Sequence, residues 1–326
     1  MDDRVLLQRL AEGPATGDAL AAAAGLTRAA VWKRIEGLRA AGIRILGAPG
    51  RGYVLAEPLD LLRPDSIRAG IEPGAAGMLA GLDVAWSVDS TNTRLLEKPA
   101  PMAGALVLLA ERQTAGRGRR GRTWASPLAA HLYLSLARQF SGGLGRLGGL
   151  SLVAGVAAAE ALHGLGFEDV RLKWPNDLVV RDRDGLRKLG GLLVEGGGEH
   201  AGPVRAVLGI GLNVRMPAAA AAAIDQPWCD LAGLGPAPSR NAIAAALLSQ
   251  LLPALDSFDR GGLAAFLPRY ARFDALSGQR VRLHLVDGES DALALGLADD
   301  GALRVRLDDG TVRLLHSGEV SIRMGA

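Results

Sequence analysis

The sequence is poor in cysteine and in net charge. Cys229 is the only cysteine among 326 residues, which excludes an internal disulfide and a zinc site built from several cysteines. The 37 basic and 34 acidic residues leave a net charge of only +3, too small for a protein that coats DNA through its overall charge. The five histidines are scattered without the spacing of metal ligands, so we expect no dedicated transition-metal site.

Long hydrophobic runs and a targeting segment are also lacking. Apolar stretches such as residues 150–162 end well short of the roughly 20 residues that span a bilayer. The acidic start, residues 1–4, is unlike a signal peptide. We therefore expect a cytoplasmic protein without membrane contact. Its 49% hydrophobic and 22% charged residues are typical of a globular chain.

The first 64 residues have the pattern of a winged helix-turn-helix. Helical spacing of apolar residues, with Thr16 and Thr27 at capping positions, predicts three short helices. Two apolar stretches around a glycine-rich turn, residues 43–55, then predict a small hairpin. In DNA-bound examples the third helix enters the major groove. We predict DNA contacts from the basic residues of this helix and of the wing, Arg28, Lys33, Arg34 and Arg51.

Two features leave the use of DNA open. A winged helix that mediates only protein contacts is the alternative interpretation of the same residues. Trp32 stands at a recognition-helix position that more usually carries a polar residue, so the sequence does not define an operator.

A connector at residues 57–64 leads into a region of mixed helices and strands. Strands are predicted at 83–88, 105–110, 131–137, 170–173, 189–195 and 205–211, and buried helices at 150–162 and 241–258. Near the C-terminus, five short strands separated by Asp-Gly turns predict a small barrel. The expected fold class is α+β multidomain, with domains at 1–64, 65–274 and 275–326.

The positive charge is concentrated in residues 111–124. Five arginines stand there against one glutamate, a local net charge of +4. Residues 116–121 match the pattern G-x-G-x-x-G, but Pro127 follows soon after, and no acidic residue for a ribose occurs between Glu111 and Glu160. This excludes a Rossmann site. Arg122 stands where a P-loop requires lysine, which excludes that site as well.

What remains is an anion-binding loop of three glycines and four arginines. Glycine lets backbone N–H groups approach an anion closely, and arginine offers bidentate donors. Because like charges repel one another, we expect the loop to be mobile when empty and ordered by its ligand. A basic surface loop that touches nucleic acid is the alternative.

Three further segments carry candidate binding groups. Residues 173–177 place a cation, an amide and a carboxylate at the end of a strand, which suits nucleotide recognition; a capped turn is the alternative. Lys188 precedes Gly190 and Gly191, where backbones can pass closely, so its side chain can reach a ligand. Residues 209–213 form another strand end with room for close approach.

Together these motifs resemble the biotin–protein ligases, of the bifunctional bacterial type that is both ligase and biotin-operon repressor. The segments that carry the resemblance follow the family's order along nearly the whole chain: 27–31, 50–53, 90–92, 113–122 with Trp124, 173–177, 188–191, 209–213 and 318–323. Lipoate ligases share the catalytic fold but favour a different Arg-Gly-Gly loop, so the run at 116–121 favours biotin.

The resemblance implies a central domain of the biotin/lipoate ligase type and an SH3-like C-terminal barrel. The implied enzyme joins biotin to ATP, forming biotinyl-5′-AMP and pyrophosphate, and passes the biotinyl group to a lysine of a biotin carboxyl carrier domain. Mg²⁺ is expected to arrive with ATP. A homodimer, formed through edge strands of the central sheet, would place two N-terminal domains on a palindromic biotin operator.

The resemblance also implies site residues. Expected catalytic residues are Lys188, Arg119, Arg122 and Asp177, with Lys188 bridging the biotin carboxylate and the phosphate or activating the acceptor amine. Biotin is expected at Ser90, Thr91, Asn92, Gln113, Gly116, Arg117, Arg119, Lys188, Gly191 and Gly209. ATP and the adenylate are expected at Arg117, Arg119, Arg120, Arg122, Trp124, Lys173, Asn176, Asn213 and Arg323. A DNA-binding biotin sensor without ligase activity and a lipoate-type ligase are the alternative functions.

Overall fold

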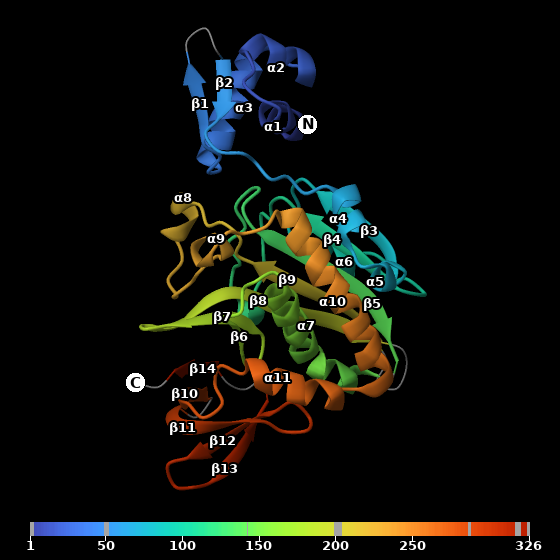
Figure 1. Cartoon of the computed structure of the whole chain (residues 1–326), viewed down its shortest axis with the longest axis vertical. Helices are drawn as coiled ribbons and strands as arrows, with labels where there is room; N and C mark the ends of the chain where they lie inside the picture. The colour runs from blue at the N-terminus through green and yellow to red at the C-terminus, as the bar shows by residue number, and fades with distance from the viewer. Residues whose placement is uncertain are drawn as a thin grey trace.

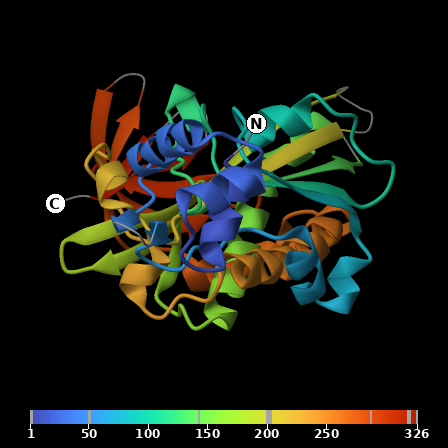
Figure 2. The same ribbon diagram turned by 90° about the horizontal axis from the view of Figure 1, so that it is seen from above.

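The computed structural model describes residues 3–48, 52–141, 143–198, 204–285, 288–316 and 321–324. Along its long axis it shows a small N-terminal domain, a central sheet with its helices, and a small C-terminal sheet (Figure 1). Seen from the N-terminal end, the first helices lie over the middle of the central domain (Figure 2).

The N-terminal domain contains the three helices and the hairpin that the sequence predicts. The helices are α1 (Arg4–Ala11), α2 (Gly17–Ala24) and α3 (Arg28–Ala40), and the hairpin pairs β1 (Ile45–Ala48) with β2 (Gly52–Leu55). The hydroxyls of Thr16 and Thr27 accept hydrogen bonds from the first turns of α2 and α3, which confirms both predicted caps. Arg51, at the predicted wing tip, lies outside the described residues.

The central domain is built on one mixed sheet, as predicted, but with seven strands where the sequence predicts six. Its strand order is β3-β4-β5-β9-β8-β7-β6, with β3 and β4 parallel and the other neighbours antiparallel. The strands are β3 (Leu79–Ala85), β4 (Ala105–Ala110), β5 (Leu132–Phe140), β6 (Val170–Lys173), β7 (Asp177–Asp182), β8 (Gly185–Gly198) and β9 (Val204–Leu212).

The strand β7 is missing from the sequence prediction. Its apolar centre, Leu178, Val179 and Val180, is buried throughout, so it shows no alternation of polar and apolar residues. It is also bounded by Asp177 and Asp182, which resemble the ends of a turn. A short buried strand of this kind has no periodic signature that separates it from a loop.

One face of the sheet is covered by the two long apolar helices α7 (Leu150–Gly164) and α10 (Arg240–Gly261), which lie side by side (Figure 1). The stretch Leu147–Gly164, which contains α7, and helix α10 are long and apolar enough to cross a membrane, but 67% and 61% of the two stretches are buried inside the protein. They are core helices. The remaining helices of this domain are α4 (Pro64–Gly70), α5 (Pro73–Ala76), α6 (Thr91–Leu96), α8 (Ala218–Ala221), α9 (Leu231–Leu234) and α11 (Leu267–Phe273), with short 3-10 turns at Arg119–Gly121, Leu144–Gly149 and Ala264–Phe266.

The opposite face of the sheet carries α6. Leu95 of this helix packs against Leu108, Ala137 and Val207, whereas Leu109, Leu136 and Leu208 point to the side of α7 and α10. This alternation follows from the two-residue period of a strand. The α6 face is covered less completely, which leaves space for a cavity on the sheet.

The C-terminal domain contains the five predicted strands as an antiparallel sheet. They are β10 (Arg280–Leu285), β11 (Gly288–Leu297), β12 (Leu303–Leu307), β13 (Val312–Leu315) and β14 (Ser321–Met324), in the order β13-β12-β11-β10-β14. Within the described strands β13 and β14 do not pair with each other. The small sheet is therefore confirmed, and its closure into a barrel stays a prediction.

A buried ion pair fastens the connector to the central domain. Arg240, at the start of α10, lies 2.8 Å from Glu111, and the two side chains are 3% and 2% exposed. Glu111 also accepts a 2.6 Å hydrogen bond from the backbone N–H of Leu62, and Arg240 donates to the carbonyl of Asp60. Since Glu111 directly follows β4, the connector is bound at the start of the arginine-rich segment 111–124, which we call the arginine loop.

Candidate active site

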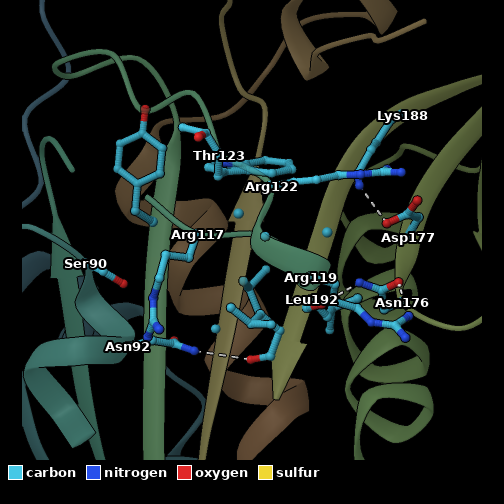
Figure 3. A pocket seen from close by; sticks show the side chains of 18 of the residues that line it. Ser90, Asn92, Arg117, Arg119, Arg122, Thr123, Asn176, Asp177, Lys188 and Leu192 are labelled. Atoms are coloured by element: carbon cyan, nitrogen blue, oxygen red, sulfur yellow. Dashed lines mark hydrogen bonds and ion pairs between the residues drawn. The ribbon is translucent and has the colours of Figure 1, made fainter. Parts of the chain in front are cut away.

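A cavity opens on the α6 face of the sheet, between the arginine loop and strands β5, β8 and β9. Most of the sequence-predicted site residues, although distant in sequence, line it together (Figure 3). They are Ser90, Thr91, Asn92, Gln113, Arg117, Arg119, Arg120, Arg122, Trp124, Lys173, Asn176, Asp177, Lys188, Gly191 and Gly209.

Two glycines of β9 allow large side chains to lie flat on the sheet. A Cβ atom at Gly209 would stand 2.3 Å from the amide oxygen of Asn92, and one at Gly211 would stand 2.4 Å from the indole of Trp124. Neither position tolerates a side chain without displacing its neighbour. The glycines therefore create the floor of the cavity.

A chain of neutral polar groups lines the end of the cavity near α6. The side-chain oxygen of Gln113 accepts the backbone N–H of Thr91 at 2.8 Å. The hydroxyl of Ser135, fully buried on β5, lies 2.7 Å from that of Thr91 and 2.5 Å from the amide oxygen of Asn92. Such donors and acceptors suit a neutral polar ligand group.

The arginine loop is bound to the sheet at two points. Arg117 forms a 2.8 Å ion pair with Glu195 of β8, and Arg119 donates a 3.0 Å hydrogen bond to Asn176. The loop also folds on itself, since the backbone N–H of Trp124 donates to the carbonyl of Gly116 at 2.9 Å. The ordering of this loop by a ligand stays a prediction.

Two arginines of the loop are in unusual states, one in its side chain and one in its backbone. Burial lowers the pKa of the Arg119 guanidinium, and the nearby carboxylate of Asp177 opposes that change. Arg120 has φ 57°, a left-handed backbone that costs a non-glycine residue of the order of 1 kcal/mol. Strained backbone of this kind is typical of segments that hold a ligand.

Lys188 lies in the middle of the cavity wall. Its Nζ atom is 2.7 Å from Asp177 Oδ1 and 5.5 Å from the ring centroid of Trp124 (Figure 3). The backbone of Lys188 is held on both sides, by the carbonyl of Pro227 at 3.0 Å and the N–H of Cys229 at 2.9 Å. A fixed ammonium here can bind an anion on one side while Asp177 balances its charge.

Residues 173–177 form the wall opposite the arginine loop. The indole N–H of Trp174 donates to the carbonyl of Gly301 in the C-terminal domain at 3.0 Å. The carbonyl of Pro175 accepts from Ser151 at 3.2 Å, and Asn176 donates to the carbonyl of Leu192 at 2.7 Å. The segment is thus fixed by three parts of the fold, and its polar side chains face the cavity.

Three expected site residues are not among those that line the cavity. Asn213 is 5% exposed and donates to the carbonyls of Cys229 and Lys188, behind the cavity wall. Gly116 shapes the arginine loop and does not line the cavity. The backbone of Arg323 belongs to β14, and its side chain lies outside the described part of the structure.

Several residues of this site are not predicted from the sequence. Tyr133 and Gln226 line the cavity, while Ser135 and Glu195 bind residues that line it. One signal for Ser135 was available, because it is the single hydroxyl amino acid inside the apolar strand β5 except for Tyr133. Gln226 lies in a stretch without periodicity, where sequence gives no placement.

The described residues offer little for a dedicated metal site. No group of three or more His, Cys, Asp or Glu side chains among them is arranged to hold an ion. Asp177, the acidic residue on the cavity wall, is paired with Lys188. These residues fit a Mg²⁺ ion held mainly by ligand phosphates and water, as is usual for nucleotide-bound magnesium.

Three of the four predicted DNA-binding residues, Arg28, Lys33 and Arg34, lie on α3, in the N-terminal domain and outside the cavity lining (Figure 1). Arg28 pairs with Asp18 at 3.3 Å, and Arg34 pairs with Asp3 at 2.6 Å. Lys33 is exposed, with no acidic partner among the described residues. Trp32 is 58% exposed on the same helix. The exposed cationic character of α3 is therefore smaller than its sequence suggests.

Three family models match successive parts of the chain. Residues 84–213 match the Biotin/lipoate A/B protein ligase family. Residues 4–54 match an HTH domain, and residues 276–323 match the Biotin protein ligase C terminal domain.

Several characterised relatives match the chain over most of its length. It is 37% identical to the bifunctional ligase/repressor BirA of Escherichia coli, over 94% of this chain and 92% of that protein. It is 35% identical to the biotin–[acetyl-CoA-carboxylase] ligase of Mycobacterium tuberculosis, over 80% and 97% of the two chains. Among solved structures, a biotin protein ligase from Aquifex aeolicus in complex with biotin and ATP aligns with a TM-score of 0.62 at 27% identity, over 76% of this chain and 100% of the other.

Proposed function

This chain belongs to the biotin protein ligase family, and from that premise we propose that it activates biotin with ATP and transfers it to a carrier protein. The first step joins the biotin carboxylate to the α-phosphate and releases pyrophosphate. In the second step a lysine amine of a biotin carboxyl carrier domain attacks the acyl carbon of biotinyl-5′-AMP, and AMP leaves.

The observation that carries this proposal is the division of one cavity into a neutral polar end and a cationic end. Thr91, Gln113 and Asn92 supply uncharged donors and acceptors near α6, which suit a ureido ring. Arg119 and Lys188 supply positive charge at the other end. A carboxylate attacking a phosphate brings two anions together, so fixed cations stabilise the charge of the transition state.

We assign the residues to roles on this basis. Lys188 contacts the biotin carboxylate and the α-phosphate, and the arginine loop closes over the phosphates with Arg119 and Arg122. Asp177 orients Lys188 and can accept a proton from the acceptor amine in the second step. Mg²⁺ bound to ATP neutralises phosphate charge. Asn213 acts through the backbone of Lys188, to which it donates at 3.4 Å.

The remaining assignments follow the same division. The biotin residues at the neutral end are Ser90, Thr91, Asn92, Gln113 and Gly209, with Gly116 shaping the loop beside them. The other biotin residues, Arg117, Arg119, Lys188 and Gly191, extend this site toward the cationic end. The adenylate residues at the cationic end are Arg117, Arg119, Arg120, Arg122, Trp124, Lys173 and Asn176, joined by Arg323 from the C-terminal domain.

The N-terminal domain supports a second part of the proposal, repression of a biotin operon. Lys33 and Trp32 stand exposed on α3, the helix that enters DNA in this class of domain. Two copies would bind a palindromic operator as a homodimer. One outer edge of the central sheet, β3, is partly occupied, since Arg4 and Arg68 donate to carbonyls of this strand. We therefore do not assign the dimer contact to that edge.

The proposal includes the location and division of the protein. We place the chain in the cytoplasm, where it would meet biotin and the carrier protein. We divide it into three domains, residues 1–64, 65–274 and 275–326. Closure of the last domain into an SH3-like barrel belongs to the same proposal.

Incubation with biotin, ATP, Mg²⁺ and a carrier domain, followed by mass measurement of the carrier, tests the enzymatic part. We expect the carrier to gain one biotinyl group only when both biotin and ATP are present. Biotin binding without any mass gain would favour a sensor over a ligase. A gain with lipoate in place of biotin would favour the lipoate-type alternative.

A further inference from the structure

Glu195 lies beside the neutral end of the cavity and has no role in the assignments above. Its side chain on β8 is 24% exposed. One of its oxygens, Oε2, accepts hydrogen bonds from Asn92 Nδ2 and from Arg117 Nη2, each at 2.8 Å. A single carboxylate oxygen thus joins three separate parts of the site: the start of α6, the arginine loop and the central sheet.

The contact with Asn92 fixes the direction of the neighbouring hydrogen bonds. A carboxylate can only accept, so the NH₂ group of Asn92 faces Glu195 and its amide oxygen faces Ser135, 2.5 Å away. Ser135 must then donate its proton to Asn92. The hydroxyl of Thr91 lies 2.7 Å from the Ser135 oxygen and donates its own proton to the side-chain oxygen of Gln113 at 3.0 Å. The charge of Glu195 therefore orients the Ser135 hydroxyl, which it does not touch.

The contact with Arg117 fixes the arginine loop. Four arginines lie within residues 117–122, and their mutual repulsion favours an open loop. The pair with Glu195 spans 78 residues of sequence and holds the first of these arginines over β8. It supplies negative charge to the loop before any substrate anion is bound.

We infer that Glu195 is a positioning residue of the substrate site, which sets the Asn92 amide and favours the position of Arg117 at the cavity against the mutual repulsion of the loop arginines. This inference rests on the proposed ligase function. It adds a residue that acts only through others, because Glu195 does not line the cavity itself.

Three variants separate its two contacts from a general effect on folding. Glu195→Ala removes both contacts, whereas Glu195→Gln keeps an acceptor for Asn92 but loses the charge that holds Arg117. Glu160→Gln is the matched control. Glu160 is also 24% exposed and also pairs with one arginine, Arg269, but on helices α7 and α11 away from the cavity.

Two measurements are made on the full-length protein. The first is the rate of tryptic cleavage within residues 112–124 without ligand, and the second is biotin-dependent adenylate formation over a range of biotin concentrations. We expect Glu195→Ala to raise the KM for biotin about tenfold, the loss of one hydrogen bond to a charged group, with kcat changed less than about threefold because only ground-state positioning is lost. Glu195→Gln should have a KM for biotin close to that of the wild type, but trypsin should cleave its loop as fast as that of Glu195→Ala.

Cleavage and KM in Glu195→Ala that match those of Glu160→Gln would overturn the inference. So would equal losses of kcat in both Glu195 variants together with a Tm below that of Glu160→Gln, which would indicate a structural role. If the wild-type protein forms no adenylate at all, the proposed function fails. The cleavage comparison then still decides whether Glu195 holds the loop.

Discussion

The arginine loop and helix α3 carry similar sets of basic residues but present them differently. In the loop, Arg117 and Arg119 bind partners 78 and 57 residues away in sequence, Glu195 on β8 and Asn176 between β6 and β7. On α3, Arg28 and Arg34 are paired with acidic residues of the same small domain. The loop cations surround a concave space, whereas those of α3 stand on a convex surface.

The difference shows that local charge does not by itself define a ligand. Both segments are basic in sequence, and both suggest contact with phosphate. The loop is set apart by the neutral donors of Thr91 and Gln113 and by the carboxylate of Asp177 around the same space. A small molecule with a neutral end and an anionic end fits that cavity, whereas the exposed face of α3 fits an extended partner such as DNA.

The largest expected effect concerns the buried ion pair that holds the connector, the segment between the two regions. Arg240→Ala leaves Glu111 buried without its ion pair, so we expect the free energy of unfolding to fall by about 3–5 kcal/mol. Chemical denaturation of the full chain measures this. Arg269→Ala, which breaks a partly exposed pair, should cost only about 0–1 kcal/mol. Equal losses in the two variants would mean that the connector is not held by this pair.

The next largest effect is on the rate of adenylate formation, which should depend on the arginines of the loop and not on those of α3. Arg119→Ala removes a cation from the cavity and should lower the rate of adenylate formation by about 10²–10³-fold, the usual cost of one transition-state donor. Arg28→Ala, on α3, should leave that rate unchanged. Pyrophosphate release under saturating substrates measures both. A similar loss in the two variants would contradict a catalytic role specific to the loop.

The sequence predicted both of these regions. The glycines at 116, 118 and 121 and the arginines between them indicated an anion site, and the helical spacing of Val31, Ile35 and Leu38 indicated the core of the N-terminal domain. What the sequence could not give were contacts between distant segments. The pairing of Arg34 with Asp3 offsets part of the charge predicted to contact DNA, and that of Arg117 with Glu195 adds a site residue. Both depend on tertiary packing.

A third effect distinguishes the regions by their response to acid. Burial, with the positive charge of Arg240, lowers the pKa of His131 to about 3, against about 6.5 in an unfolded chain. Between these values the unfolded state binds a proton that the native state does not. The stability of the central domain should therefore fall as the pH drops below about 6.5, by up to about 1.4 kcal/mol per pH unit.

Hydrogen exchange of the full chain between pH 7 and pH 5 measures this response region by region. Residues 1–64 contain no histidine, so their stability should lack this contribution. His131→Asn should flatten the pH dependence of the central domain. An unchanged slope in that variant would show that another group causes the acid response.

The smallest effect concerns DNA. Lys33→Ala should weaken binding to operator DNA and reduce the slope of log K against log salt by about 1, as expected for one phosphate contact. Trp32→Ala should instead change the preference among DNA sequences, because an apolar side chain in the major groove contacts thymine methyl groups. Fluorescence anisotropy over a salt series measures both. Binding that neither variant changes would exclude α3 as the DNA-contacting helix.

The central claim is that the cavity, and not α3, is the cationic site that serves the chemistry of biotin activation. Biotin-dependent exchange of labelled pyrophosphate into ATP, compared in wild type, Lys188→Ala and Lys33→Ala, tests it most directly. We predict exchange in wild type and Lys33→Ala, dependent on added biotin, and a loss of at least about 10²-fold in Lys188→Ala. Exchange at the wild-type rate in Lys188→Ala would contradict the account.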